Sequence, residues 1–280
     1  MEEQENKEVL AAAAAEKATS MVPVTDLSSY MYCPRLLYQQ KVLGKKERLN
    51  AAMILGAIRH NFYDLANKHE ENIVVHLPAN VTMDETTEAY SKTYRNLIKA
   101  AVMTRSKSLA LFDIQPFEIL EQLQPIAAAE ATERAANVHK FSSDNNASGE
   151  SLWRQLSPKI ITELRVKSDK MRLKGTVDRI EMHADTVIPI ELKTGKMPRD
   201  GVWPAHRVQA AAYMMLLQET FNAPINKAII RYLDHDSSKT VTLNPYMEME
   251  VTELTEKVSR LLQAKEVPAP CGREGCGCRP

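Results

Sequence analysis

A chain of 280 residues is long enough to bury one large hydrophobic core or two smaller ones. Its 44% hydrophobic and 26% charged residues are ordinary for a globular protein, and its 36 basic residues are balanced by 36 acidic ones, so net charge gives no sign of a polyanionic partner. The longest apolar runs are too short to cross a bilayer, and the acidic N-terminus resembles no secretory signal or transit peptide. We therefore expect a cytoplasmic protein without a membrane partner.

The first part of the chain predicts an acidic tail followed by helices. Residues 1–20 are rich in Ala and Glu and have no definite apolar stripe, which indicates a flexible tail. Thr25 or Asp26 is a suitable N-cap for a helix that reaches about Val42. Pro34 lies inside this stretch, so we expect the helix to kink there or to divide into two.

The middle of the chain predicts mainly helices. Helical spacing of apolar residues indicates three of them, over residues 50–68, 84–105 and 118–139, the last two separated near Pro116 and the last one broken near Pro125. The β-branched run at residues 73–77 predicts a short strand, and residues 141–150 have loop composition. We interpret residues 80–150 as a helical insertion.

The second half alternates between strand and helix patterns. Strands are expected over residues 158–167, 172–182, 186–193, 227–233 and 240–243, and helices over residues 204–221 and 248–265. The prediction is a mixed α/β (α+β) fold with a central sheet flanked by helices.

The two strands at residues 172–193 form a predicted hairpin that gathers charged side chains. If Ala184 and Asp185 form a two-residue turn, Asp178 lies directly opposite Glu191, and Lys193 shares the face of Glu191 because the two are two residues apart. Pro189 cannot donate to a neighbouring strand, so it predicts a bulge or an edge before Glu191.

Two carboxylates and a lysine at one point predict a metal site. Carboxylates suit Mg²⁺ or Mn²⁺, and a lysine can orient a metal-bound water or stabilise charge on a phosphate. Glu163, in the strand that enters the hairpin, is a further acidic candidate. The alternative is a surface hairpin held by a cross-strand ion pair.

Basic residues crowd around the hairpin and predict a polyanion-binding wall. They are Arg165, Lys167, Lys170, Arg172, Lys174, Arg179, Lys193, Lys196 and Arg199. The alternative is a solvated strand face.

The C-terminus is rich in cysteine. Cys271, Cys276 and Cys278 lie within eight residues, and Cys33 is the remaining cysteine of the chain. In a cytoplasmic protein this pattern favours metal or cluster ligation over disulfides, and both zinc and a 4Fe–4S cluster accept four cysteines. The alternative is a tail of unligated cysteines.

Several motifs follow one another in a characteristic order. They are YCPR at residues 32–35, GxxxH at 56–60, GTVD at 175–178, ELKTG at 191–195, QxxxY at 209–213 and the terminal cysteines. In this order the chain resembles the RecB-like form of the PD-(D/E)XK nuclease superfamily, and more closely the iron–sulfur exonucleases associated with CRISPR adaptation. The resemblance covers residues 22–70 and 158–278 and leaves out residues 80–150.

The resemblance implies a restriction-endonuclease-like core in a single RecB-like nuclease domain at residues 21–280. It implies that His60, Asp178 and Glu191 bind Mn²⁺ or Mg²⁺ together with the backbone carbonyl of Leu192. It further implies that Lys193 assists the attacking water and that two side chains of one helix, Gln209 and Tyr213, position the substrate.

For the cysteines, the resemblance implies a 4Fe–4S cluster held by Cys33 and by the tail at residues 266–280, with zinc as the alternative. Members of the family space the last three cysteines as C-x2-C-x5-C, whereas this chain has C-x4-C-x-C. The implied activity is exonucleolytic cleavage of single-stranded DNA, with the CRISPR integrase proteins as partners. Our candidates for DNA contact are Arg35, Arg59, Lys174 and Lys196.

Two other functions compete with this one. The first is an iron–sulfur RecB-like exonuclease of DNA repair or replication, although no helicase or P-loop motif is present. The second is a non-catalytic DNA-binding subunit that keeps the fold and the cysteines. The complete set of acidic residues and lysine argues against the second.

Overall fold

The computed structural model describes residues 21–46 and 49–278, so the tail predicted at residues 1–20 lies outside the described residues. The described chain forms two compact units. The first, which we call the core unit, contains residues 21–46, 163–180 and 186–278. The second, the helical unit, contains residues 49–162 and 181–185. None of the described helices combines the length and the apolar character that spanning a bilayer requires.

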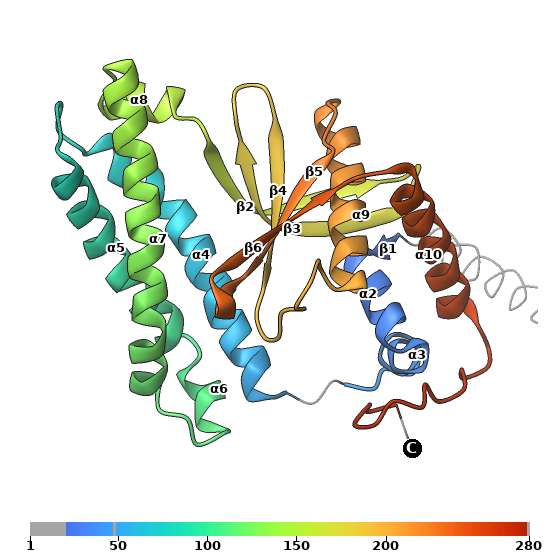
Figure 1. The fold of residues 1–280 in the computed structure, drawn as a ribbon. Coiled ribbons are helices and arrows are strands. Elements are labelled where there is room, and N and C mark those ends of the chain that lie inside the picture. Colours follow the sequence, from blue (N-terminus) through green and yellow to red (C-terminus); the bar gives the residue numbers. More distant parts are fainter. Residues whose placement is uncertain (1–20, 47–48, 279–280) are drawn as a thin grey trace, which may run out of the picture. The chain divides into compact units, whose positions relative to one another are not determined.

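Six strands form one mixed sheet, which confirms the predicted fold class (Figure 1). They are β1 (Val22–Pro23), β2 (Lys159–Ser168), β3 (Leu173–Met182), β4 (Val187–Lys193), β5 (Lys227–Tyr232) and β6 (Ser237–Thr242). Their order is β1-β3-β4-β5-β6, with β2 paired to β3. β1 runs parallel to β3 and β4 parallel to β5, whereas β6 is antiparallel to β5.

Strand β4 is an interior strand, so of the two predicted alternatives for Pro189 the sheet edge is wrong, and the bulge stays a prediction. The strand continues through Pro189, and its pairing with β5 starts one residue later, where Ile190 faces Ile229. The proline therefore precedes the parallel ladder, in which its missing N–H would cost a hydrogen bond.

Helices of the core unit pack against this sheet. Helix α9 (Pro204–Phe221) contacts β4 and β5, and α2 (Val24–Tyr32) and α10 (Pro245–Gln263) pack on α9 (Figure 1). Ala210, Ala211 and Ala212 are buried on α9, and such small side chains allow a helix to approach its neighbours closely. The carboxyl end of β4 and the first turns of α9 are thereby held together.

Pro34 divides the first helical stretch as predicted. Helix α2 ends at Tyr32, Cys33 is extended, and α3 (Pro34–Lys41) begins at the proline. The predicted N-cap is wrong, because Pro23 holds the cap position of α2. Asp26 instead lies in the first turn, where it forms an ion pair with Lys41 at 2.9 Å.

The helical unit consists mainly of α4 (Ala51–Val75), α5 (Met83–Met103), α6 (Ser106–Ala110), α7 (Pro116–Asn145) and α8 (Gly149–Gln155). Helix α5 packs along both α4 and α7. In their shared interior, Arg134 forms a buried ion pair with Glu70, and Tyr90 donates to the same carboxylate at 2.9 Å. Because each partner is paired, the burial of this charge is tolerated.

Three sequence predictions for this unit are wrong. Residues 73–75 form the last turn of α4 rather than a strand, since Ile73 and Val74 pack in the helical interior. Pro125 does not break α7; the carbonyl that it leaves without a helical donor belongs to the exposed residue Glu121, where water can reach it. The loop predicted at residues 141–150 is largely the end of α7 and the start of α8.

Candidate functional site

Asp178 on β3 and Glu191 on β4 lie on neighbouring strands of the core unit. The Oδ2 atom of Asp178 accepts a hydrogen bond from the backbone N–H of Leu192 at 2.9 Å. The strands leave residues 183–186 between them, which agrees with a short turn. The direct pairing of Asp178 with Glu191 stays a prediction.

Lys193 forms two side-chain hydrogen bonds, one within β4 and one that joins β4 to α9. Its Nζ atom donates to Oε1 of Glu191 and to Oε1 of Gln209, both at 2.8 Å. Gln209 closes the triangle because its Nε2 atom donates to Glu191 Oε1 at 2.6 Å. Glu191 and Gln209 are 5% and 4% exposed, so this network is shielded from solvent, which strengthens its hydrogen bonds.

Tyr213 follows Gln209 by one helical turn on α9 and belongs to the same cluster. Its hydroxyl is hydrogen-bonded to the Gln209 side chain and to the Thr176 backbone, and burial raises the pKa of Tyr213. The ring lies directly on β3, because a Cβ atom at Gly175 would come within 2.6 Å of the ring atom Cε1. The GTVD segment therefore needs its glycine for the approach of this ring.

Burial and one neighbouring acid disfavour the ionised form of Asp178. Burial raises the pKa of Asp178 to about 6, although the Leu192 hydrogen bond and the charge of Lys193 act in the opposite direction. Glu163 adds to the rise, and its carboxylate oxygen lies within 4.8 Å of one from Asp178. A donor set of hard carboxylate oxygens fits Mg²⁺ or Mn²⁺, whose charge would favour the ionised form of each acid.

The other residues predicted to bind the metal or the DNA lie in different parts of the structure. Leu192 is buried on β4 between Glu191 and Lys193, so its backbone belongs to this cluster. His60 lies on α4 in the helical unit, and its role as a metal ligand stays a prediction. Arg59, predicted to contact DNA, is buried on the same helix.

The four cysteines come together in the core unit. Their Sγ atoms all lie within 4.8 Å of one another, and those of Cys271 and Cys278 are 3.6 Å apart. Burial raises the pKa of the Cys33 thiol, whereas a backbone hydrogen bond lowers that of Cys278. Four thiols at this separation fit a metal centre, which would hold them as thiolates.

The spacing of the sulfur atoms bears on which centre fits. Tetrahedral bonds of about 2.3 Å to one zinc ion place sulfur atoms about 3.8 Å apart. In a 4Fe–4S cluster each thiolate binds a different iron atom, so the sulfur atoms are farther apart. The observed separations match a single ion without movement of the cysteines, and a cluster requires them to spread.

Side chains of α3 hold the cysteine tail by its backbone. Arg35 donates from Nε to the Cys278 carbonyl at 2.9 Å and from Nη1 to the Pro268 carbonyl at 2.8 Å. Gln39 donates to the same Cys278 oxygen at 3.3 Å, and Tyr38 to the Ala264 carbonyl at 3.0 Å. The sequence did not reveal these contacts, because any residue supplies a backbone carbonyl. DNA contact by Arg35 stays a prediction.

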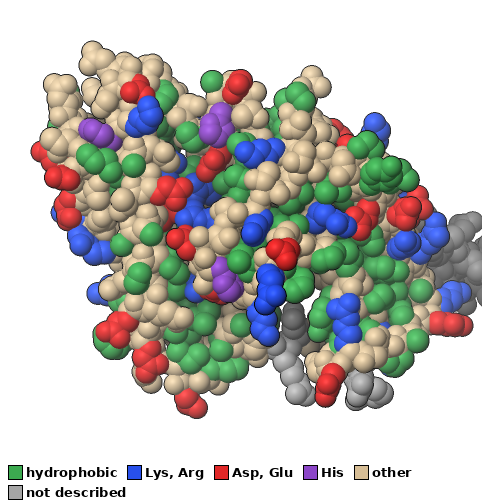
Figure 2. Space-filling model, viewed as in Figure 1, with side chains coloured by type: hydrophobic (Ala, Val, Ile, Leu, Met, Phe, Trp, Pro, Cys, Tyr) green, Lys and Arg blue, Asp and Glu red, His purple; other side chains and the backbone are tan. Residues whose placement is uncertain are grey.

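The two predicted lysine contacts are exposed. Lys174 lies on β3, and Lys196 lies in the loop after β4. Neighbouring side chains hold this loop: Trp203 donates to the Lys196 carbonyl at 3.0 Å, the carboxylate of Asp234 accepts from the Gly195 N–H, and the His235 ring lies 3.1 Å from the Gly195 carbonyl. On the visible face of the molecule, basic side chains are interspersed with acidic and apolar ones (Figure 2).

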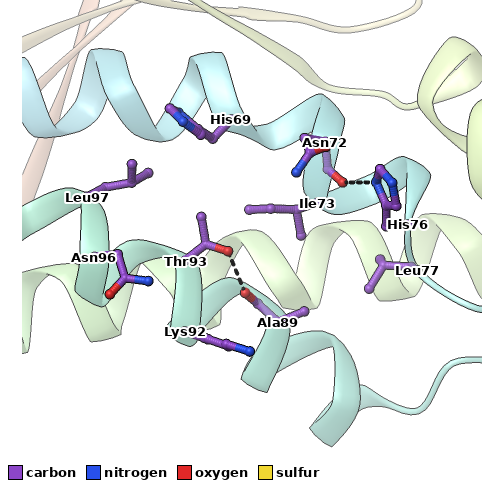
Figure 3. Close-up of a pocket in the computed structure, with 10 residues that line it drawn as sticks. All are labelled: His69, Asn72, Ile73, His76, Leu77, Ala89, Lys92, Thr93, Asn96 and Leu97. Atoms are coloured by element: carbon purple, nitrogen blue, oxygen red, sulfur yellow. Dashed lines mark hydrogen bonds between the residues drawn. The ribbon is translucent and has the colours of Figure 1, made fainter.

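The helical unit carries a cavity of about 540 Å³ between α4 and α5 (Figure 3). Two histidines line it, but His69 uses Nδ1 for the Leu65 carbonyl and His76 uses Nδ1 for the Asn72 carbonyl of the same helix. The Thr93 hydroxyl likewise donates to the Ala89 carbonyl of its own helix. These are ordinary helix-internal contacts and indicate no ligand.

The family model of the PD-(D/E)XK nuclease superfamily matches residues 22–279, which is nearly the whole chain. The chain belongs to this superfamily. The superfamily is named for acidic residues and a lysine, and our candidates for them are Asp178 on β3 and Glu191 and Lys193 on β4. The sequence-based resemblance to this superfamily is thereby confirmed.

Two further comparisons place this nuclease chain beside known proteins. Over 120 residues it is 28% identical to a Myxococcus xanthus (strain DK1622) protein described as a CRISPR-associated exonuclease Cas4/endonuclease Cas1 fusion. The match covers 41% of this chain and 21% of the fusion, so it spans about a fifth of that protein's length. The chain is also similar to a solved structure described as "Crystal structure of SSO0001", with 16% identity, a TM-score of 0.28 and coverage of 70% of this chain and 84% of that one.

Proposed function

We propose that this nuclease is an exonuclease that hydrolyses single-stranded DNA with Mn²⁺ or Mg²⁺. The observation that carries the proposal is the position of Lys193, which contacts Glu191 and Gln209 beside the carboxylate of Asp178. An ion pair on a surface hairpin needs no buried amide partner and no second, half-buried acid beside it. A hydrolytic site uses both to orient its lysine and to bind a cation.

Asp178 and Glu191 would hold the metal, together with His60 and the carbonyl of Leu192. The bound metal supplies a water of lowered pKa and a Lewis acid for the scissile phosphate. The Lys193 ammonium has three donors, and among the described residues Glu191 and Gln209 accept two of them. The third is left for the attacking water or for a phosphate oxygen.

The biological setting is a further part of the proposal. The similarity to the fusion described as a CRISPR-associated exonuclease supports a role in trimming DNA ends for CRISPR adaptation, with the integrase proteins as partners. The competing setting is DNA repair or replication. Co-purification of the tagged chain with an integrase from the same genome tests the first, and its absence together with a neighbouring repair operon would favour the second.

The activity is tested with end-labelled single-stranded DNA and Mn²⁺. We expect the wild type to shorten the strand stepwise and Lys193→Ala to leave it intact. Lys227→Ala is the matched control, because Lys227 is an exposed lysine on a neighbouring strand, β5. Equal degradation by wild type and Lys193→Ala would contradict the catalytic role, and binding without degradation by either would support a non-catalytic DNA-binding subunit.

We propose that the four cysteines hold a 4Fe–4S cluster, on the strength of the family resemblance. The separations of their Sγ atoms favour a second candidate, a single zinc ion. Iron, acid-labile sulfide and zinc are measured in protein purified without oxygen. Four iron and four sulfide per chain, with broad visible absorption, would support the cluster. Stoichiometric zinc without iron would overturn it.

A further inference from the structure

The core unit carries a pocket of about 560 Å³ beside the carboxylate–lysine cluster. We call it the β2–β3 pocket, and it is lined by Pro23, Thr25, Arg165, Val166, Lys167, Lys174, Gly175, Thr176 and Tyr213. These residues come from β1, α2, β2, β3 and α9, which are distant in sequence. The pocket is therefore built by the sheet and its covering helices, and its size suits about one nucleotide with some open space.

The charged residues that line the β2–β3 pocket are all basic. Arg165 and Lys167 lie two residues apart on β2, and Lys174 lies on β3; all three side chains are exposed. None of the described lining residues is acidic. Three cations in a lining that contains no carboxylate favour a ligand with several negative charges, and phosphate groups are the usual ligands of such clusters.

The rest of the pocket wall is uncharged. Val166 and Tyr213 are buried, with Pro23 and Gly175 beside them, and Thr25 and Thr176 add two hydroxyl groups. This combination of an apolar wall, hydroxyl groups and a cationic rim fits a nucleotide better than a free phosphate, because the sugar and base can cover apolar surface while the rim binds the phosphate.

Two residues connect the β2–β3 pocket with the proposed catalytic centre. Tyr213 lines the pocket and is hydrogen-bonded to Gln209, which contacts Lys193. Thr176 lines it as well, and it precedes Asp178 by two residues on β3, so both lie on the same face at a distance of about 7 Å. A strand bound at the centre thus reaches the pocket within about one nucleotide.

We propose that the β2–β3 pocket is a subsite for the nucleotide adjacent to the scissile phosphate of the single strand. Its sugar and base occupy the apolar wall, and its phosphates bind Arg165, Lys167 and Lys174. The inference rests on the proposed function for the identity of the strand. It adds a place where an unpaired nucleotide enters the protein surface, which a rigid duplex cannot do without unpairing.

The cationic rim is tested by binding of a fluorescent ten-nucleotide dT strand in the Lys193→Ala background without added divalent metal. We expect Lys167→Gln/Lys174→Gln to weaken binding about tenfold at about 0.15 M salt and to lower the salt-dependence slope by about 1 to 1.5. The matched control is Lys227→Gln/Lys265→Gln, which removes two exposed lysines from elsewhere in the core unit. Equal affinities of the two double variants would overturn the proposal.

The occupant of the pocket is tested by size and by the base. Thr25→Trp keeps the charge but fills the pocket, and we expect it to weaken binding of the dT strand about fivefold or more and that of a fully abasic strand much less. Two results would show that the DNA backbone passes over the rim and that no nucleotide enters the pocket. The first is that Thr25→Trp binds the dT strand as tightly as the protein with Thr25 does. The second is that the protein with Thr25 binds the dT strand and the abasic strand equally well. Circular dichroism confirms that each variant folds.

The outcomes separate this subsite from the proposed function. If the wild type hydrolyses single strands while the pocket variants bind and cleave like their controls, the subsite is wrong and the nuclease activity stands. If the wild type hydrolyses no DNA but the dT strand binds with the expected dependence on Lys167, Lys174 and Thr25, the catalytic proposal fails and the pocket stands as a nucleotide-binding site.

Discussion

Arg35 and Cys278 are joined by a hydrogen bond from the guanidinium Nε to the backbone carbonyl, 2.9 Å long and spanning 243 residues of sequence. The same guanidinium donates to the Pro268 carbonyl. Since Cys33 directly precedes α3 and Cys278 ends the cysteine cluster, this contact ties both parts of the four-cysteine site together. Arg35 is thereby a positioning residue for that site.

The first prediction concerns this contact. We expect Arg35→Ala to lower the metal content of the purified protein by half or more and the free energy of unfolding by about 1–3 kcal/mol, because two carbonyls lose a charged donor. Metal analysis and urea denaturation measure both effects. We expect Arg35→Lys to have nearly as low a metal content and stability as Arg35→Ala, since an ammonium group cannot reproduce the two hydrogen bonds of the guanidinium.

Arg260→Ala is the matched control for Arg35, because Arg260 pairs with Glu256 on the exposed face of α10. If Arg35→Ala keeps as much metal and stability as Arg260→Ala, the positioning role is refuted. Full metal content combined with weaker DNA binding would instead support the DNA contact predicted from the sequence.

The second prediction concerns Gln209, which contacts both Glu191 and Lys193. Gln209→Leu keeps the volume but removes both hydrogen bonds, so we expect kcat for DNA hydrolysis to fall about 10- to 100-fold. Gln218→Leu on the same helix is the control, because Gln218 contacts the Ile225 carbonyl and has no bond to the cluster. Equal kcat values for the two variants would contradict the role of Gln209.

The third prediction concerns the approach of Tyr213 to Gly175. A Cβ atom at residue 175 would lie 2.6 Å from Tyr213 Cε1 and 3.3 Å from Val24 Cγ2. Gly175→Ala should therefore cost about 1–3 kcal/mol of unfolding free energy. In a double-mutant cycle with Tyr213→Leu, this cost should shrink by at least half. An unchanged cost would assign the strain to Val24 or to the backbone.

The fourth prediction is a pH dependence from His206, whose ring nitrogen lies 3.1 Å from the Tyr232 hydroxyl. Burial, helped by the charge of Lys193, lowers the pKa of His206 from 6.5 to about 4. Between these values the unfolded chain binds a proton that the folded chain does not. The contribution of His206 to stability is therefore complete above pH 6.5 and is lost as the pH falls towards 4.

Asp178 acts in the opposite sense, because its pKa is raised from 3.8 to about 6 and the folded chain holds the extra proton. Its contribution favours the fold at acidic pH and is lost as the pH rises through 6. His206→Gln removes only the first effect. We expect urea denaturation to show that the variant loses less stability than the wild type between about pH 7.5 and about pH 5. An equal or larger loss would be inconsistent with a half-buried, neutral His206.

The local sequence pattern was sufficient to predict most helices and strands of the core unit. The β-branched runs predict β3, β4 and β5, and Pro34 predicts the division between α2 and α3. The period-2 rule also places Glu191 and Lys193 on one face, where they form an ion pair at 2.8 Å. These features depend on neighbours within a few residues, so the sequence states them directly.

The sequence pattern predicted the wrong conformation where burial in the tertiary structure decides it. Ile73 and Val74 have the composition of a strand, but the interior between α4 and α5 accepts them as the end of a helix. Pro125 is tolerated because Glu121, whose carbonyl loses its helical donor, is exposed. Local propensities are smaller than the free energy of burying an apolar face, so the tertiary environment overrides them.

By itself the sequence determined the superfamily, and it supplied the candidate acidic residues, their lysine and the four cysteines, because side-chain identity carries that chemistry. Only the tertiary structure decided that Gln209 is hydrogen-bonded to both Glu191 and Lys193. It also decided that Arg35 donates to the carbonyl of Cys278 and that three cations border the β2–β3 pocket. These contacts join residues from separate elements, and many of them use backbone atoms that every residue shares. Their geometry exists only once the sheet and its helices have packed together.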